Sequence, residues 1–304
     1  MNEKIGLVLG IIFIVVFSGF FYFNHIFMNV SEDRFYSQDF DISKNKILIY
    51  GSSHLIQVNT THIQNQIGII SEKYHIYNMA ENADKPKKRS LNIEKDLKLN
   101  PEIVIYGIGF RDFNSITNEK SEFDFKLVDL IPFDTTELET LNPKLITLSV
   151  LRSIIIDMIN GNSNVPYPNT AVFSQRIQEK IKDFEELQEN SESFENILIP
   201  TQKNEQKEYF IDIIETLSKN KIKIIILITP HHSLAQEKIP ESEKINFYKI
   251  LTEIEDQFDV TVYNYSDRYE NYSIWRDTSH IAYNEKSIMF SDDVAKIIIK
   301  EITK

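Results

Sequence analysis

The sequence contains no cysteine, and only 8 of its 304 residues are glycine. The absence of cysteine excludes disulfide bonds, thiolate nucleophiles and cysteine-based metal sites. Basic residues are also outnumbered, because 33 Lys and Arg against 45 Asp and Glu give a net charge of −12. A protein that neutralises phosphates needs a basic face, so we expect no nucleic-acid partner. The content of 42% hydrophobic and 26% charged residues is typical of a globular domain.

Charged residues are missing from one long stretch near the N-terminus. Residues 5–27 contain no Asp, Glu, Lys or Arg and are long enough to span a bilayer as a helix. The bulky residues at the end of the stretch argue against a cleaved signal peptide. Lys4 before the stretch and acidic residues after it place the N-terminus in the cytoplasm by the positive-inside rule. We therefore predict a single-pass cell-membrane protein with an anchor (1–28), a linker (29–44) and an extracytoplasmic domain (45–304).

Five short, continuous apolar runs in the remaining chain predict the strands of a sheet. The runs are KILIYG (46–51), YHIYN (74–78), EIVIYG (102–107), KIIILI (223–228) and VTVYN (260–264). Continuous runs are typical of parallel strands that are covered on both faces. Apolar residues at helical spacing lie on either side of the fourth run, and Asn284 can cap a closing helix through Ile302. This alternation predicts an α/β fold with a doubly wound, mainly parallel five-stranded sheet.

Residues 114–204 interrupt the alternation of strands and helices. LITLSVLRSIIIDMI (145–159) and RIQEKIKDFEELQ (176–188) have helical patterns, and GNSNVPYPN (161–169) between them has the composition of a loop. We predict a helical insertion between the third and fourth strands. The insertion either shapes a substrate cleft or caps the sheet.

Polar and reactive residues follow the carboxyl end of each predicted strand, which is the edge where open parallel sheets bind ligands. The segments are Gly51–His54, Asn78–Asn82, Gly107–Asp112, Pro230–His232 and Trp275–His280. A serine at a strand-to-helix turn becomes a nucleophile when an imidazole takes its proton and an acid orients the imidazole. Asp277 and His280 are three residues apart and can face the same serine. A zinc site on His231, His232 and an acid is an alternative, but that spacing matches no common zinc pattern.

Two of these segments resemble the first and fifth sequence blocks of the SGNH (GDSL-type) hydrolase superfamily. In ILIYGSSH, the third residue of the Gly-Asp-Ser block corresponds to Ser53, which makes Ser53 the nucleophile and puts Ser52 at the usual aspartate. WRDTSHIAYN resembles the Asp-x-x-His block and gives Asp277 and His280 as acid and base. The resemblance covers roughly residues 45–112 and 205–304, and it implies a sheet with flavodoxin-like strand order.

The other blocks depart from the superfamily pattern at oxyanion-hole positions. YNMAENA has Ala80 at the usual glycine, and IVIYGIGFRDF has Arg111 where asparagine is usual. The resemblance implies an oxyanion hole formed by the backbone N–H groups of Ser53 and Ala80 together with Arg111. Further candidate substrate contacts are polar and aromatic side chains near these blocks, namely His54, Asn78, Asp112, His231, His232 and Trp275.

A Gly-Ser-Ser first block on a membrane-anchored chain is similar to cell-envelope members of the superfamily. That similarity implies an esterase or acyltransferase that acts through a Ser53 acyl-enzyme on O-acyl groups, above all O-acetyl groups, of an extracytoplasmic glycan. It implies no cofactor and no metal, and it implies membrane proteins of envelope biosynthesis as partners. The alternative is a non-catalytic assembly or glycan-binding protein that keeps the fold, which the altered second and third blocks favour.

Overall fold

The structure is a computed structural model, and it describes residue 18 and residues 44–115, 178–189, 194 and 196–304. Apart from residue 18, the described residues belong to one compact unit formed by Asp39–Phe123 and Thr170–Lys304. The predicted anchor except residue 18, the predicted linker up to residue 43 and the predicted helix over 145–159 lie outside the described residues.

The predicted membrane localisation requires a correction. Over residues 44–115 and the later described segments, no helix has the length and apolar character needed to cross a bilayer. This finding contradicts the predicted single-pass localisation in the cell membrane.

A five-stranded sheet lies at the centre of the described unit. Its strands are β1 (Asn45–Tyr50), β2 (Tyr74–Asn78), β3 (Pro101–Ile108), β4 (Lys223–Ile228) and β5 (Val260–Asn264). They pair in the order β2-β1-β3-β4-β5, and every pair is parallel. The predicted strands and the flavodoxin-like order are confirmed. Continuous apolar runs identified the strands because β1, β3 and β4 are covered on both faces and are almost wholly buried.

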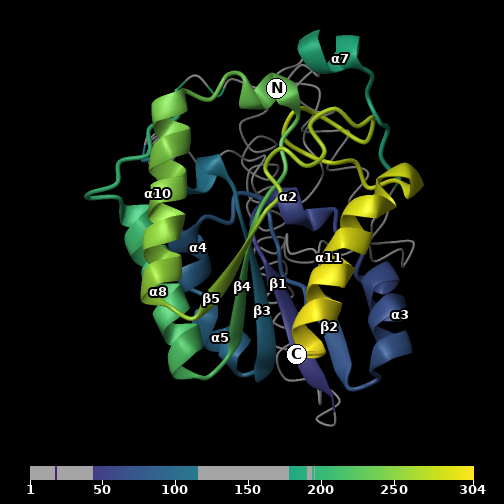
Figure 1. Ribbon diagram of the computed structural model, residues 1–304, viewed down its shortest axis with the longest axis vertical. Helices are drawn as coiled ribbons and strands as arrows, with labels where there is room; N and C mark the ends of the chain where they lie inside the picture. The colour runs from purple at the N-terminus through teal and green to yellow at the C-terminus, as the bar shows by residue number, and fades with distance from the viewer. Residues whose placement is uncertain (1–17, 19–43, 116–177, 190–193, 195) are drawn as a thin grey trace, which may run out of the picture. The chain divides into compact units, whose positions relative to one another are not determined.

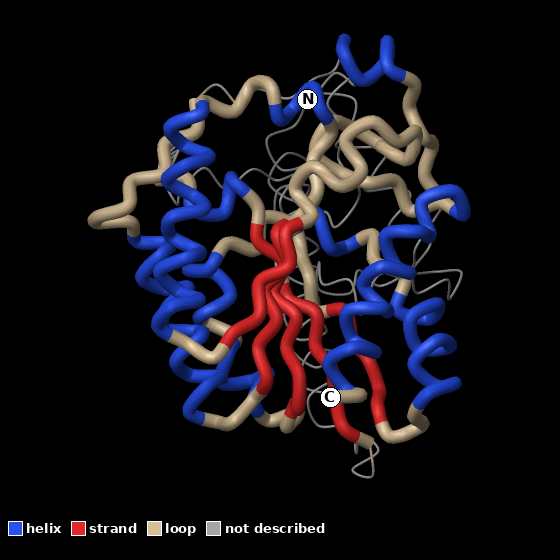
Figure 2. The backbone as a smooth tube through the Cα atoms, in the orientation of Figure 1, coloured by secondary structure: helices blue, strands red, loops and turns tan. Residues whose placement is uncertain are grey.

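Helices cover both faces of the sheet (Figures 1 and 2). One face carries α3 (Thr60–Ile70) and α11 (Ile288–Ile302), which also pack against each other. The opposite face carries α4 (Pro86–Ser90), α5 (Ile93–Leu97), α8 (Glu205–Lys219) and α10 (Glu241–Gln257). This three-layer arrangement is the doubly wound architecture that the sequence predicts.

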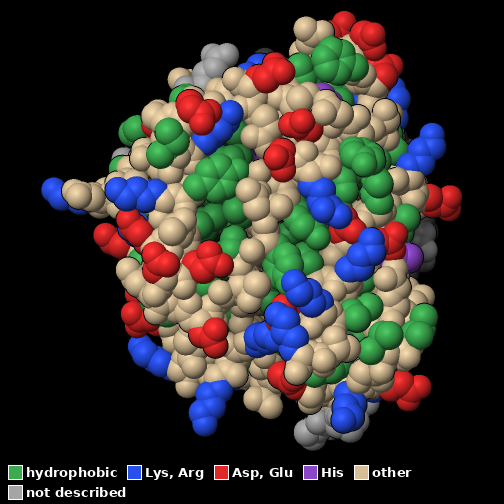
Figure 3. Space-filling model, viewed as in Figure 1, with side chains coloured by type: hydrophobic (Ala, Val, Ile, Leu, Met, Phe, Trp, Pro, Cys, Tyr) green, Lys and Arg blue, Asp and Glu red, His purple; other side chains and the backbone are tan. Residues whose placement is uncertain are grey.

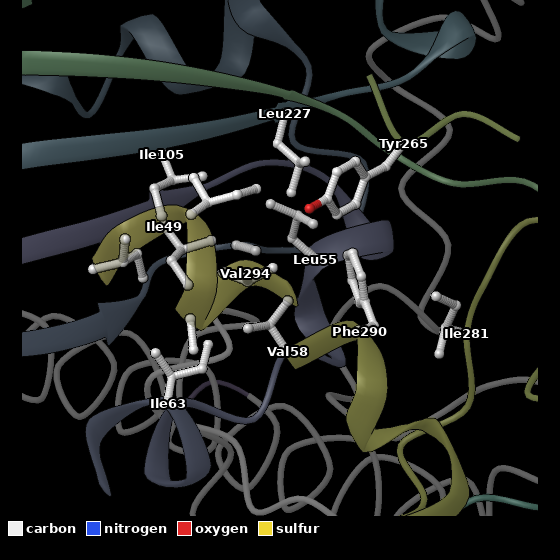
Figure 4. Close-up of a cluster of buried hydrophobic side chains, with 14 of the residues drawn as sticks. Ile49, Leu55, Val58, Ile63, Ile105, Leu227, Tyr265, Ile281, Phe290 and Val294 are labelled. Atoms are coloured by element: carbon white, nitrogen blue, oxygen red, sulfur yellow. The ribbon is translucent and has the colours of Figure 1, made fainter. Parts of the chain in front are cut away.

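The core on the α3 and α11 side of the sheet joins the strands to the first helix after β1 (Figure 4). Ile49, Ile105 and Leu227 come from β1, β3 and β4, and they lie near Leu55 of α2 (Ser53–Ile56) and Val294 of α11. All five side chains are at most 1% exposed. Burying one such side chain stabilises a fold by about 1.5–3 kcal/mol. Because Leu55 is two residues after Ser53, this packing also fixes the position of Ser53.

The helix predicted over residues 176–188 forms only in its second part. Helix α7 spans only Phe184–Glu189, and it begins where the Asp183 side chain accepts the N–H of Glu186 at 2.9 Å. Residues 178–183 are not helical. The N–H groups of Glu179 and Lys182 donate to carbonyl oxygens in the Trp275–Tyr283 loop, at 2.9 and 2.8 Å. These hydrogen bonds to a distant loop replace the bonds along a helix.

Asn284 caps the chain before its last helix, as predicted, but through an intervening turn. Its Oδ1 accepts the N–H of Lys286 at 3.1 Å within the 3-10 turn η4 (Glu285–Ser287), and α11 follows directly.

Acidic and basic side chains both lie on the face seen in Figure 3. That face therefore has no field of a single sign, despite the net charge of −12.

Candidate active site

A sharp turn after β1 places Ser53 at the start of α2. Gly51 has a φ of +145°, a conformation that other residues rarely adopt, and a Cβ there would lie 2.8 Å from the carbonyl oxygen of Gly107. A Cβ on Gly107 would in turn lie 2.2 Å from the Leu55 side chain. The two glycines therefore let the end of β1, the end of β3 and helix α2 come together. Ser53 is the first residue of α2, so its backbone N–H has no carbonyl acceptor within the helix.

Ser53, His280 and Asp277 form a chain of hydrogen bonds. The Oγ of Ser53 lies 2.6 Å from Nε2 of His280, which is 227 residues further along the chain. The Nδ1 of His280 lies 2.8 Å from Oδ1 of Asp277. All three side chains are partly exposed, so a reactant can approach Ser53. A carboxylate can only accept hydrogen bonds, so Nδ1 of His280 carries the proton and Nε2 is left to accept from the serine hydroxyl.

Asp277 is held in its ionised form by its neighbours. Burial by itself would raise the pKa of Asp277, but the hydrogen bond with His280 and the charge of Arg276 hold that pKa well below its ordinary value. The Oδ1 of Asp277 also accepts the N–H groups of Ser279 and His280, at 2.9 and 2.8 Å. Arg276 bonds to Oδ2 of Asp277 at 3.2 Å and to Glu179 at 2.9 Å. The sequence patterns did not indicate that Arg276 and Glu179 support Asp277. The only sign of such a role was that Arg276 directly precedes Asp277.

His54 lies behind His280 rather than at the surface. Its ring stacks on that of His280, with centroids 4.9 Å apart and planes at 16°, and its Nδ1 lies 2.9 Å from Oγ of Ser52. Burial, followed by the charge that His280 can carry, lowers the pKa of His54 well below its ordinary value. The ring is therefore neutral at pH 7. Since His54 is only 7% exposed, its predicted role as a substrate contact is corrected to a packing role beside the imidazole of His280.

His231 is fully buried, which corrects its prediction as a substrate contact. Its ring lies among His54, Phe110 and Phe194. Nδ1 is 3.1 Å from the carbonyl oxygen of Thr229, so Nδ1 carries the proton and Nε2 has only a lone pair. Burial lowers the pKa of His231 to about 4. At neutral pH, Nε2 of this residue therefore cannot donate a hydrogen bond to an oxyanion.

The predicted oxyanion donor at Ala80 is already engaged in the structure. The N–H of Ala80 donates to Oδ1 of Asn78 at 3.1 Å, and Nδ2 of Asn78 donates to the carbonyl oxygen of Leu55 at 2.8 Å. Asn78 is 4% exposed and links the end of β2 to α2. Its predicted role as a substrate contact is corrected to a structural one. The side-chain amide of Asn78 also competes with an oxyanion for the N–H of Ala80.

Arg111 and Asp112, which follow β3, point to different surroundings. The Arg111 guanidinium lies over the ring of Phe194 at 4.1 Å, and its charge lowers the pKa of both His54 and His231. Asp112 is buried, and its Oδ2 accepts the N–H of Gly109 at 2.6 Å in the turn η1 (Phe110–Phe113). The predicted substrate contact at Asp112 is therefore corrected to a turn-forming role.

His232 and Trp275, both predicted as substrate contacts, pack among the loops beside the site. The Nδ1 of His232 accepts the N–H of Leu234 at 3.1 Å, and its ring meets Trp275 edge-on at 5.8 Å. Trp275 is fully buried, and its Nε1 donates to the carbonyl oxygen of Tyr269 at 3.0 Å. Among the residues that the structure describes, no three His, Asp or Glu side chains are grouped as metal ligands.

Comparisons with known proteins found likenesses of fold only. No family model matches the sequence, and no curated protein matches it. An esterase from Pseudoalteromonas sp. is 10% identical over 86% of this chain and 100% of that chain, with a TM-score of 0.48. An acetyl xylan esterase is 12% identical over 83% of this chain and 99% of that chain, with a TM-score of 0.46. A GDSL-like lipase from Bacteroides thetaiotaomicron is 11% identical over 88% of this chain and 92% of that chain, with a TM-score of 0.42.

The GDSL-like lipase carries the name of the superfamily whose blocks this sequence resembles. At 10–12% identity and TM-scores below 0.5, these likenesses assign no activity to the chain.

Proposed function

We propose that this chain is a serine ester hydrolase of the SGNH type, with Ser53 as nucleophile, His280 as base and Asp277 as the acid that orients the base. The observation that carries the proposal is the hydrogen-bonded chain from Ser53 Oγ to His280 Nε2 (2.6 Å) and from His280 Nδ1 to Asp277 Oδ1 (2.8 Å). The same three residue types in the same order of contacts activate serine in unrelated hydrolases.

The reaction proceeds in two halves through a covalent ester. His280 Nε2 takes the proton from Ser53 as Oγ attacks the carbonyl carbon of the substrate ester. The tetrahedral intermediate collapses, the bond to the leaving alcohol breaks, and His280 returns the proton to that alcohol. A water molecule then attacks the acyl group on Ser53 with His280 as base, and the carboxylic acid leaves while Ser53 regains its proton. Asp277 stays ionised throughout and stabilises the imidazolium form of His280.

The developing oxyanion needs hydrogen-bond donors that are in place before the reaction. The N–H of Ser53, in the first turn of α2, is one such donor. We assign Arg111 as a second donor, because it follows β3, whose end at Gly107 meets Gly51 just before Ser53, and because its charge acts on the buried ring of His54 next to Ser53. Ala80 can contribute its N–H only if it exchanges its hydrogen bond to Asn78 for one to the oxyanion.

The proposed substrate is an O-acyl group, in the first instance O-acetyl, on a glycan, and this part of the proposal rests on the resemblance of the sequence blocks. Water or a sugar hydroxyl accepts the acyl group from Ser53. A glycan-binding protein without catalytic activity is the second candidate, because the N–H of Ala80 is engaged and asparagine is replaced by Arg111.

Labelling of the purified protein with a fluorophosphonate, alongside hydrolysis of p-nitrophenyl acetate, tests the proposal. The wild type should be labelled and active, Ser53→Ala should lose both properties, and Ser52→Ala should keep the label. An unlabelled, inactive wild type with normal folding would favour the non-catalytic candidate. Activity that survives in Ser53→Ala but not in Ser52→Ala would show that the nucleophile is Ser52.

A further inference from the structure

A pocket of about 200 Å³ lies beside the segments that carry Ser53 and His280. Apart from Ile288, its lining consists of residues with amide, hydroxyl or carboxylate side chains, chiefly Gln57, Asn59, Tyr283, Asn284, Ser287 and Ser291. Gln57 follows Ser53 by four residues at the end of α2, a rise of about 6 Å along a helix. Tyr283 follows His280 by three residues. The pocket is therefore lined by residues that closely follow Ser53 and His280 in the chain.

Part of the polar lining is already fixed by hydrogen bonds within the protein. The backbone N–H of Asn59 donates to Oγ of Ser291 at 2.9 Å and joins two sides of the pocket. The side-chain amide of Asn284 donates to the carbonyl oxygen of Glu179 at 3.0 Å and accepts the N–H of Lys286 at 3.1 Å. The walls are thus held in place before any ligand enters, which reduces the entropy lost on binding.

Gln57 differs from Asn59, Asn284 and Ser291 in this respect. The residue is 6% exposed, and its Oε1 is buried without a hydrogen-bond partner among the described residues. Buried side-chain oxygens nearly always have a donor partner in proteins. Oε1 is an acceptor, so the group that satisfies it carries an O–H or N–H.

The chemistry of the lining favours a neutral ligand rich in hydroxyl groups. Amide and hydroxyl groups match the mixed donors and acceptors of a polyol, whereas the carboxylate of Glu285 in the rim disfavours an anion. Tyr283 and Ile288 add apolar surface for the C–H groups of a ring. We infer that this pocket binds the neutral sugar unit that bears the ester, and that the Gln57 side chain turns toward the pocket so that a sugar hydroxyl donates to its Oε1. This inference rests on the proposed hydrolase function for its catalytic test.

The kinetic test compares a sugar ester with an ester that has no sugar. The probes are 6-O-acetyl methyl α-D-glucopyranoside and p-nitrophenyl acetate, and the variants are Gln57→Leu and Tyr283→Leu. Gln257→Leu is a matched control, because Gln257 is exposed at the end of α10. We expect Gln57→Leu to lower kcat/KM for the sugar ester relative to that for p-nitrophenyl acetate by about 10-fold, the loss typical of one hydrogen bond. The control should leave this ratio at the wild-type value.

A binding test separates this inference from the proposed reaction. Methyl α-D-glucopyranoside is titrated into ¹⁵N-labelled Ser53→Ala protein, and the side-chain amide signal that disappears in Gln57→Leu identifies Gln57. We expect that signal to shift on titration, whether or not the wild type hydrolyses esters. An unmoved signal, or an equal loss of activity on both esters in Gln57→Leu and Tyr283→Leu, would overturn the sugar pocket while leaving the nucleophile assignment intact. Absence of all esterase activity with a shifted signal would instead refute the reaction and keep the pocket.

Discussion

The imidazole rings of His54 and His280 are stacked nearly parallel, with 4.9 Å between their centroids. Ser52 Oγ holds Nδ1 of His54 at 2.9 Å, and burial keeps the His54 ring neutral. His280 therefore rests against a flat, uncharged surface that does not repel the imidazolium formed when His280 takes the serine proton. This arrangement gives Ser52 and His54, which flank the nucleophile in sequence, a structural purpose.

The stacking of His54 on His280 can be tested by keeping or removing the ring. His54→Phe preserves a flat neutral surface, whereas His54→Ala removes it and lets His280 move. We expect His54→Ala to lower kcat on p-nitrophenyl acetate by up to about 100-fold with little change in KM, because small displacements of a catalytic group have effects of that size. His54→Phe should retain most of the wild-type kcat. Equal losses in both variants would mean that the imidazole itself, and not its surface, is required.

Asp277 should be essential as a carboxylate. The Asp277→Asn substitution keeps the size of the side chain but can present an N–H to Nδ1 of His280, which favours the wrong tautomer of the imidazole. We expect kcat to fall by about 10⁴, as for the same substitution in other serine hydrolases. Asp267→Asn is a suitable control because Asp267 is exposed. The assignment fails if steady-state rates of Asp277→Asn stay within tenfold of the wild type.

Arg111 should contribute to the oxyanion hole through its charge and N–H groups. Loss of one oxyanion donor typically costs about 10²–10³ in turnover, so Arg111→Ala should lose roughly that factor on p-nitrophenyl acetate. Arg111→Asn should recover part of the loss because an amide can also donate. Melting temperatures measured in parallel show whether the lost contact with Phe194 explains the effect. Wild-type turnover in both variants would make Arg111 a purely structural residue.

Asp112 should make the protein less stable as the pH rises. Burial raises the pKa of Asp112 to about 7, whereas the unfolded value is about 3.9. Between these values the folded state binds a proton that the unfolded state lacks, so the contribution of Asp112 to the free energy of unfolding falls with increasing pH. Between pH 4 and pH 7, this contribution to the free energy of unfolding falls by about 4 kcal/mol in total.

The Asp112→Asn variant isolates that titration. Its amide oxygen can still accept the N–H of Gly109, but the side chain no longer ionises. Urea unfolding should show the variant more stable than the wild type at pH 8 and equally stable at pH 4. The quantity to compare is the difference in the free energy of unfolding between the variant and the wild type at each pH. This difference cancels the contribution of His231, which has the opposite sign because burial of its neutral ring destabilises the protein as the pH falls below about 6.5. A constant difference from pH 4 to 8 would rule out the titration of Asp112.

Gly107 should tolerate no side chain. A Cβ at this position would lie 2.2 Å from Cδ1 of Leu55, and overpacking of this kind costs about 1–3 kcal/mol. Gly107→Ala should therefore lower the melting temperature, and adding Leu55→Ala should relieve the collision. Gly68→Ala in α3 is the matched control, because nothing lies within 4 Å of its Cβ position and alanine favours a helix. A Gly107→Ala protein as stable as the wild type would contradict the packing described here.

Local sequence patterns were sufficient for the strands, whereas the order of the strands was implied by the resemblance to the SGNH superfamily. Each strand is a continuous apolar run because both faces of the sheet are covered, and that requirement acts on every residue of the run. The helix expected over 176–188 begins only at Phe184, because the N–H groups of Glu179 and Lys182 bond to the distant Trp275–Tyr283 loop, and a local pattern does not reveal such partners. The periodicity of apolar residues indicates which side of one segment is buried, but it does not indicate hydrogen bonds to residues in distant segments.

The sequence by itself determined which residues could form the site, since Ser53, Asp277 and His280 lie in short blocks at the carboxyl ends of strands. Only the tertiary structure decided the roles of their neighbours. Asn78 bonds the N–H of Ala80, His54 packs beneath His280, and Arg276 bonds both Asp277 and Glu179. The latter two arrangements join residues that are far apart in the chain. The burial, proton positions and hydrogen bonds of these side chains follow from how loops from different strands meet at one edge of the sheet.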